Sequence, residues 1–117
     1  MSRRKQRQAR KVAKGYDRHH ILFYRKEWDS GYQAKLRRCF VYEIPIDIHQ
    51  ELHQIVDAVP ALSEDEAKEL WVRFQSESEE LSLFEAFAWL MRYSPSAEFS
   101  IAIMAQYGFL RNKLGRS

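Results

Sequence analysis

The sequence predicts an α+β fold that is mostly α-helical, in which a short two-stranded unit is followed by a helix and then by three C-terminal helices. Three observations support this fold class. The chain has 117 residues, of which 45% are hydrophobic, and this length suits one domain with a buried core but not two. Two short segments in the first half are rich in strand-forming residues. The second half repeats apolar residues at helical spacing behind recognisable helix starts.

Charge divides the chain into regions of opposite sign. Residues 1–38 contain 13 Lys and Arg against 3 Asp and Glu, whereas residues 43–86 contain 2 against 12. Residues 1–16 are basic and show no apolar period before Gly15, so we expect them to form a flexible arm. The remaining residues, 17–117, are expected to form a single α-rich domain.

Two segments are expected to be strands. Residues 19–24 are short, apolar and aromatic, and residues 39–44 are rich in strand formers. Pro45 ends the second segment, because proline cannot donate to a sheet ladder. Between the two strands, Asp29 or Ser30 is expected to cap a short helix.

Four helices are expected after the second strand, and a capping residue marks the start of each. Asp47 caps the first, and capping boxes at residues 63–66 and 82–85 start the next two. Ser94 precedes Pro95 at the start of the last helix. The residues expected to face the core are Ile48, Leu52, Ile55 and Val56 in the first helix, Ala67, Leu70, Trp71 and Phe74 in the second, Phe84, Phe87, Ala88 and Met91 in the third, and Ile103, Met104, Tyr107 and Leu110 in the fourth.

The four histidines form two pairs, His19 with His20 and His49 with His53. Residues four apart on a helix point the same way, so His49 and His53 can present two imidazole nitrogens to one cation. Neighbours in an extended segment point to opposite sides, so only one of His19 and His20 can easily join them. Three neutral nitrogens suit zinc or another divalent transition ion. We therefore expect the domain to bind a metal.

The fourth position of such a site is open to water, Asp47 or Cys39. Cys39 is the only cysteine, so the chain forms no internal disulfide, and a metal ion would stabilise a small domain of this kind. With Cys39 as a ligand the site would be a closed, four-coordinate structural zinc site. The alternative is that Cys39 is simply a buried apolar residue. The lack of disulfides and of any apolar run of membrane-spanning length favours the cytoplasm of a bacterial host, with no membrane partner.

The order of these histidines resembles the ββα-metal motif of HNH nucleases, particularly the colicin-type DNases, over about a third of the chain. The motif has an adjacent histidine pair, then a strand, then a helix with two histidines. The resemblance implies that His19, His49 and His53 are metal ligands. It also implies that His20 is the general base that activates water against a phosphodiester.

One residue of the HNH pattern is missing. The motif carries an asparagine between the histidine pairs, which orients the base, and the only asparagine of this chain is Asn112. Asp29 or Glu43 can take its place only with a different geometry. A base without its orienting partner loses several orders of magnitude in rate. We therefore expect metal binding without catalysis.

A longer string is similar to short proteins encoded by phages and mobile elements of gut bacteria. It comprises residues 19–28, Gly31-Tyr32 and Ile44-Pro45, followed by His49 and His53. Some small metalloproteins from such sources are type II anti-CRISPR proteins. The resemblance implies an inhibitor that binds the RNA-guided effector nuclease and blocks DNA loading.

The charge pattern bears on the partner. The basic arm is suited to phosphates of DNA or of a guide RNA, whereas the acidic residues between Ser63 and Glu80 would repel them. Those acidic helices are better suited to a basic groove on a protein that handles nucleic acid. The favoured hypothesis is thus a zinc-stabilised inhibitor of an RNA-guided nuclease. The alternatives are an HNH-like metal-dependent endonuclease and a metal-stabilised DNA-binding accessory protein.

Overall fold

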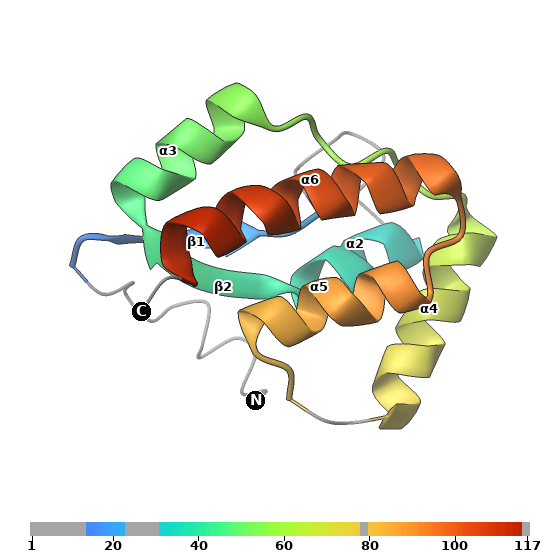
Figure 1. The fold of residues 1–117 in the computed structure, drawn as a ribbon. Coiled ribbons are helices and arrows are strands. Elements are labelled where there is room, and N and C mark those ends of the chain that lie inside the picture. Colours follow the sequence, from blue (N-terminus) through green and yellow to red (C-terminus); the bar gives the residue numbers. More distant parts are fainter. Residues whose placement is uncertain (1–13, 23–30, 78–79, 116–117) are drawn as a thin grey trace.

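The computed structural model describes residues 14–22, 31–77 and 80–115. Most of the expected basic arm, the end of the expected first strand and the candidate caps Asp29 and Ser30 lie outside these residues. The described elements follow in the order β1 (Tyr16–His20), α2 (Gly31–Cys39), β2 (Val41–Pro45), α3 (Ile46–Ile55), α4 (Glu64–Glu77), α5 (Leu83–Arg92) and α6 (Ala97–Leu114). The predicted class, α+β and mostly helical, is confirmed (Figure 1).

The sheet consists of β1 and β2, paired antiparallel from Tyr16 opposite Pro45 to His20 opposite Val41. β1 begins earlier than predicted and ends at His20. The apolar residues that follow it, Ile21 and Leu22, are fully buried in the core without being part of the strand. Their apolar character therefore reflects burial and not strand structure. A short apolar run in a sequence does not tell these two causes apart.

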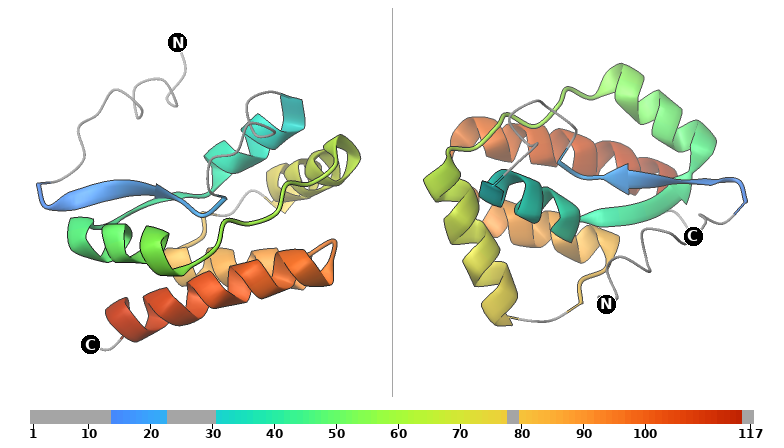
Figure 2. Two further views of the ribbon diagram at one scale, coloured as in Figure 1. Left: turned by 90° about the horizontal axis from the view of Figure 1, so that it is seen from above. Right: turned by 180° about the vertical axis from the view of Figure 1, so that it is seen from behind.

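The helices pack mainly against one another, and α3 lies against the sheet (Figure 2). α3 contacts both strands and α6, and an ion pair of 3.2 Å between Glu51 and Lys113 joins the two helices. α5 packs along α6, and α2 packs against α4. The largest fully buried side chains are Ile21, Leu22, Leu36, Phe40, Ile44, Leu52, Phe87, Leu90, Phe99, Ile103 and Leu110. No described helix is long and apolar enough to cross a lipid bilayer.

The two predicted capping boxes are confirmed. Ser63 Oγ accepts a hydrogen bond of 3.1 Å from the Glu66 amide, and Glu66 Oε1 accepts one of 3.0 Å from the Ser63 amide. Ser82 and Glu85 make the same reciprocal pair at the start of α5. These motifs depend only on residues three apart in the sequence, which is why they could be recognised there.

The other two predicted caps are wrong. Pro45 occupies the N-cap position of α3 without a side-chain bond, and Asp47 lies inside the first turn, where its Oδ1 accepts from the Ile48 amide at 2.9 Å. α6 is capped by Ser96, whose Oγ accepts from Phe99 N at 3.1 Å. Ser94 instead bonds to the backbone of Ser96.

The predicted core faces are correct in part. Leu52, Leu70, Phe87 and Leu110 are buried as expected, and so are Val56, Ala67 and Ile103. Ile55 and Met104 are, however, 61% and 56% exposed, and Ala88 is exposed as well. Because the sequence period does not fix how a helix is rotated against its neighbours, the buried face also includes residues outside the expected stripes, namely Ala86, Trp89, Leu90, Phe99 and Gln106.

Candidate metal centre

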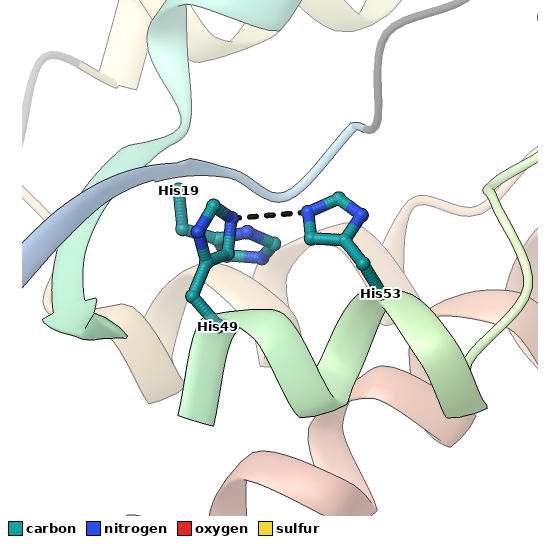
Figure 3. Close-up of side chains that lie close together, drawn as sticks. All are labelled: His19, His49 and His53. Atoms are coloured by element: carbon teal, nitrogen blue, oxygen red, sulfur yellow. Dashed lines mark hydrogen bonds between the residues drawn. The ribbon is translucent and has the colours of Figure 1, made fainter. Parts of the chain in front are cut away.

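Three histidines meet where β1 lies against α3 (Figure 3). His19 comes from the strand, and His49 and His53 come from successive turns of the helix. One nitrogen of each ring lies within 4.8 Å of one nitrogen of each of the others. Among the described residues this is the one group of His, Cys, Asp or Glu side chains that is close enough to hold a metal ion.

His49 and His53 are already spaced for a common ion. Their Nε2 atoms are 3.0 Å apart, and their ring centroids are 4.6 Å apart. Two nitrogens that bind one tetrahedral zinc ion at about 2.0–2.1 Å lie about 3.3 Å from each other. The predicted i, i+4 pair therefore places two ring nitrogens at nearly the spacing that a common zinc ion requires.

Asp17 orients the His49 ring. Its Oδ2 lies 3.1 Å from His49 Nδ1, and because a carboxylate only accepts, Nδ1 carries the proton and donates it. The Nε2 lone pair of His49 then faces His53. A carboxylate behind a histidine is the usual partner that fixes the tautomer of a metal ligand and raises its basicity.

Gln106 of α6 orients His19 in the same way. Its Nε2 donates to the carbonyl oxygen of Ile21 at 3.1 Å, which turns its Oε1 toward His19. His19 Nε2 therefore donates to that oxygen over 2.6 Å. In this tautomer the lone pair of His19 is on Nδ1, a fully buried atom. Nδ1 is thus the nitrogen that His19 offers to an ion.

The environment favours the neutral form of His19 and His53, which is the form that binds a metal. Burial lowers the pKa of His19 from 6.5 to about 4, and the nearby rings of His49 and His53 act in the same direction. The pKa of His53 is also lowered, first by burial and then by His49. Protons therefore compete little with a metal at neutral pH.

His20 is not part of the cluster. It is the neighbour of His19 in an extended strand and projects from the opposite face, as predicted. Burial, and after it the charges of Arg37 and Arg18, lower its pKa to about 4. Glu43, one of the residues considered in place of the HNH asparagine, is opposite Arg18 in the sheet register and not opposite His20.

The structure does not bring the two predicted fourth ligands to the histidines. Cys39, at the end of α2, donates from its thiol to the Lys35 carbonyl oxygen at 3.3 Å and lies 4.0 Å from Gln75 of α4. Asp47 turns toward the backbone of Ile48. Neither residue belongs to the group of side chains that could hold a metal ion. Within the described residues the cluster would therefore supply three ligands, and a fourth position would be left for water or another ligand.

Sequence reasoning did not identify Asp17 and Gln106. Asp17 is two residues before His19 in the strand and so lies on the same face of the sheet, a signal that was available from alternation. Gln106 is a polar residue between Ile103 and Leu110 on the buried face of α6. A polar residue in a core position requires a hydrogen-bonding partner, but no sequence pattern indicates that this partner is His19.

Comparison of the chain with protein-family models, with curated proteins and with solved structures gave no match. The candidate metal centre is therefore described by its own geometry: three histidines, of which two are oriented by Asp17 and Gln106.

Proposed function

We propose that this chain is a zinc-binding protein whose ion is held by one ring nitrogen each of His19, His49 and His53, which is Nδ1 in His19 and Nε2 in His49. The observation that carries the proposal is the cluster itself, in which one nitrogen of each ring lies within 4.8 Å of one nitrogen of each of the others. Zinc in proteins accepts histidine nitrogens in tetrahedral sites. The lowered pKa values of His19 and His53 and the oriented tautomers favour neutral ligands.

A bound ion would join parts of the chain that are distant in sequence. His19 lies on β1, which α6 contacts through Gln106, and the other two ligands lie on α3. A cross-link between strand and helix stabilises a small domain in the way that a disulfide would. The fourth position, open to solvent beside the exposed His53, would hold water or a partner's side chain.

Metal analysis of the purified full chain tests this proposal. We expect one zinc ion per chain, and we expect His49→Ala and His53→Ala each to abolish stoichiometric binding. His20→Ala is the matched control, because it removes a histidine from the opposite face of the same strand and should leave the zinc content unchanged. A folded chain that takes up no zinc from a metal-buffered solution would overturn the proposal.

We further propose that the zinc-loaded protein acts by binding, and that its partner is a type II RNA-guided nuclease whose DNA loading it blocks in the bacterial cytoplasm. The resemblance to small mobile-element metalloproteins supports this partner, as does the acidic first turn of α4. Glu64 and Glu66 there accept backbone hydrogen bonds from Tyr32 and Ser63. Asp65, in the same turn, is exposed and suited to a basic groove.

A cleavage assay with a guide-loaded type II nuclease tests the partner. We expect the zinc-loaded chain to prevent both DNA binding and DNA cleavage. Reversing the charge of Asp65 and of the exposed Glu69 should weaken inhibition, whereas the same reversal at Asp57, between α3 and α4, should not. Undiminished cleavage at saturating inhibitor would rule out this partner while leaving the zinc site untouched.

A second candidate is a metal-dependent endonuclease, and one observation favours it. His20 is adjacent to the proposed ligand His19 in β1, which is the place of the general base in the HNH pattern. Plasmid nicking that depends on a divalent ion and is lost in His20→Ala would establish this activity. Intact plasmid after prolonged incubation with zinc, magnesium or nickel would remove it.

A further inference from the structure

The outer face of α6 is apolar although no described element covers it. The inner face of the helix packs into the core through Phe99, Ile103, Gln106 and Leu110. On the opposite side, Ile101 is 67% exposed and Met104 56% exposed. α6 lies at the periphery of the described structure (Figure 2, left). A helix that is apolar on both faces usually has a partner on each.

This outer face is continuous along the helix. Exposed residues at spacings of three and four place Ile101, Met104, Ala105 and Gly108 on one stripe. Two charged residues end the stripe, Glu98 toward the N-terminus and Arg111 toward the C-terminus; both are exposed. The centre of the face is therefore apolar and its two ends carry opposite charges.

Gly108 is the second observation. Glycine inside a helix is about 1 kcal/mol less favourable than alanine. A Cβ at Gly108 would meet nothing within 4 Å in the described structure, so the packing of this chain does not require glycine there. A glycine on an open helix face permits the close approach of a second helix.

We propose that this face, from Glu98 to Arg111, is the interface of a homodimer in which two α6 helices pack antiparallel. In a pair centred between Met104 and Ala105, Ile101 of each copy lies opposite Gly108 of the other, where there is space for its side chain. Glu98 of each copy then lies opposite Arg111 of the other. The one stripe thus supplies both halves of a twofold-symmetric interface, which is what an isologous contact requires.

The size of this face sets the expected affinity. Fourteen helical residues span about 20 Å at about 1.5 Å per residue, so one helix pair buries less than the roughly 800 Å² per partner of a standard interface. We therefore expect a dimer with a dissociation constant of about 1 to 100 µM.

Sedimentation velocity of the full chain over that concentration range tests the proposal. The wild type should shift from monomer to dimer, and Ile101→Glu should weaken association at least about tenfold, because it places a charge in the apolar centre. Ile55→Glu is the matched control, since Ile55 is similarly exposed, at 61%, but lies on α3. A wild type that remains monomeric up to about 500 µM, far above the expected dissociation constant, would overturn the proposal.

Charge reversal tests the antiparallel arrangement. Glu98→Arg and Arg111→Glu should each weaken the dimer, and the double variant should restore it, because the two positions face each other only between copies. Failure of the double variant to improve on both single variants would overturn this arrangement. All these variants should keep their zinc content, because the ligands and Gln106 lie away from the outer face, so the dimer and the metal site can fail independently.

Discussion

At the residue scale, the candidate metal centre depends on side chains that would not touch the ion. Asp17 holds the Nδ1 proton of His49, and Gln106 accepts the Nε2 proton of His19. Each fixes which nitrogen its histidine offers. The ring therefore has less rotational freedom left to lose when it binds a metal.

We predict that Asp17→Ala lowers the zinc affinity by about 10- to 100-fold, because the loss of an outer partner frees the His49 ring and reduces its basicity. Competition titration with a chromophoric chelator measures this change. Asp47→Ala is the control: it removes a carboxylate from the first turn of α3 that does not contact the histidines. Equal affinities of the two variants would contradict the role assigned to Asp17.

The lowered pKa of His19 predicts how the metal-free protein responds to acid. The folded-state pKa is about 4 and the unfolded value is 6.5, so between these values the unfolded chain binds a proton that the folded chain does not. The contribution of His19 to the free energy of unfolding is then fully present above pH 6.5, and up to about 3 kcal/mol of it is lost as the pH falls toward 4. His20 shifts in the same direction.

Urea unfolding at several pH values in the presence of a chelator checks this dependence. In His19→Gln, which does not titrate, the free energy of unfolding should fall less between pH 7 and pH 4.5. If both proteins lose the same stability over this interval, the acid response has another source.

At the element scale, α6 is stabilised by its N-cap as well as by the packing of its buried face. Ser96 satisfies the Phe99 amide, which would otherwise lack a helical acceptor. We predict that Ser96→Ala lowers the free energy of unfolding by about 1 kcal/mol. Ser100→Ala, one turn later inside the helix, should change it by less than about 0.5 kcal/mol. Chemical denaturation of the two variants compares them, and a larger loss for Ser100→Ala would argue against Ser96 as the cap.

At the scale of the whole molecule, the zinc site would complete a set of contacts among β1, α3 and α6. β1 is held to α6 through Gln106, and α3 is held to α6 through the Glu51–Lys113 ion pair. An ion shared by His19 and the two α3 histidines would close this triangle of elements, and its binding free energy would add to the stability of the entire domain.

We predict that zinc raises the thermal stability of the wild type. At a free concentration about 100 times the dissociation constant, the gain is about 2.7 kcal/mol. Differential scanning fluorimetry with zinc and with a chelator measures the shift. His53→Ala should unfold at the same temperature under both conditions, and a zinc-dependent shift of equal size in that variant would place the ion elsewhere.

The sequence by itself determined those features that depend on near neighbours. The capping boxes at Ser63 and Ser82 join residues three apart, and the helical spacing of His49 and His53 already put both rings on one side. Strand alternation was enough to predict that only one of His19 and His20 would meet them. Such features follow from local backbone geometry, which the order of residues specifies directly.

The tertiary structure alone decided the features that join distant parts of the chain. The bond between His19 and Gln106 connects residues 87 positions apart, and Cys39 lies at the α2–α4 contact and not at the histidines. The outward rotation of Met104 likewise depends on how α6 packs against α3 and α5. Periodicity states which residues share a face, but the energy of packing the whole core selects the face that is buried and the side chains that meet there.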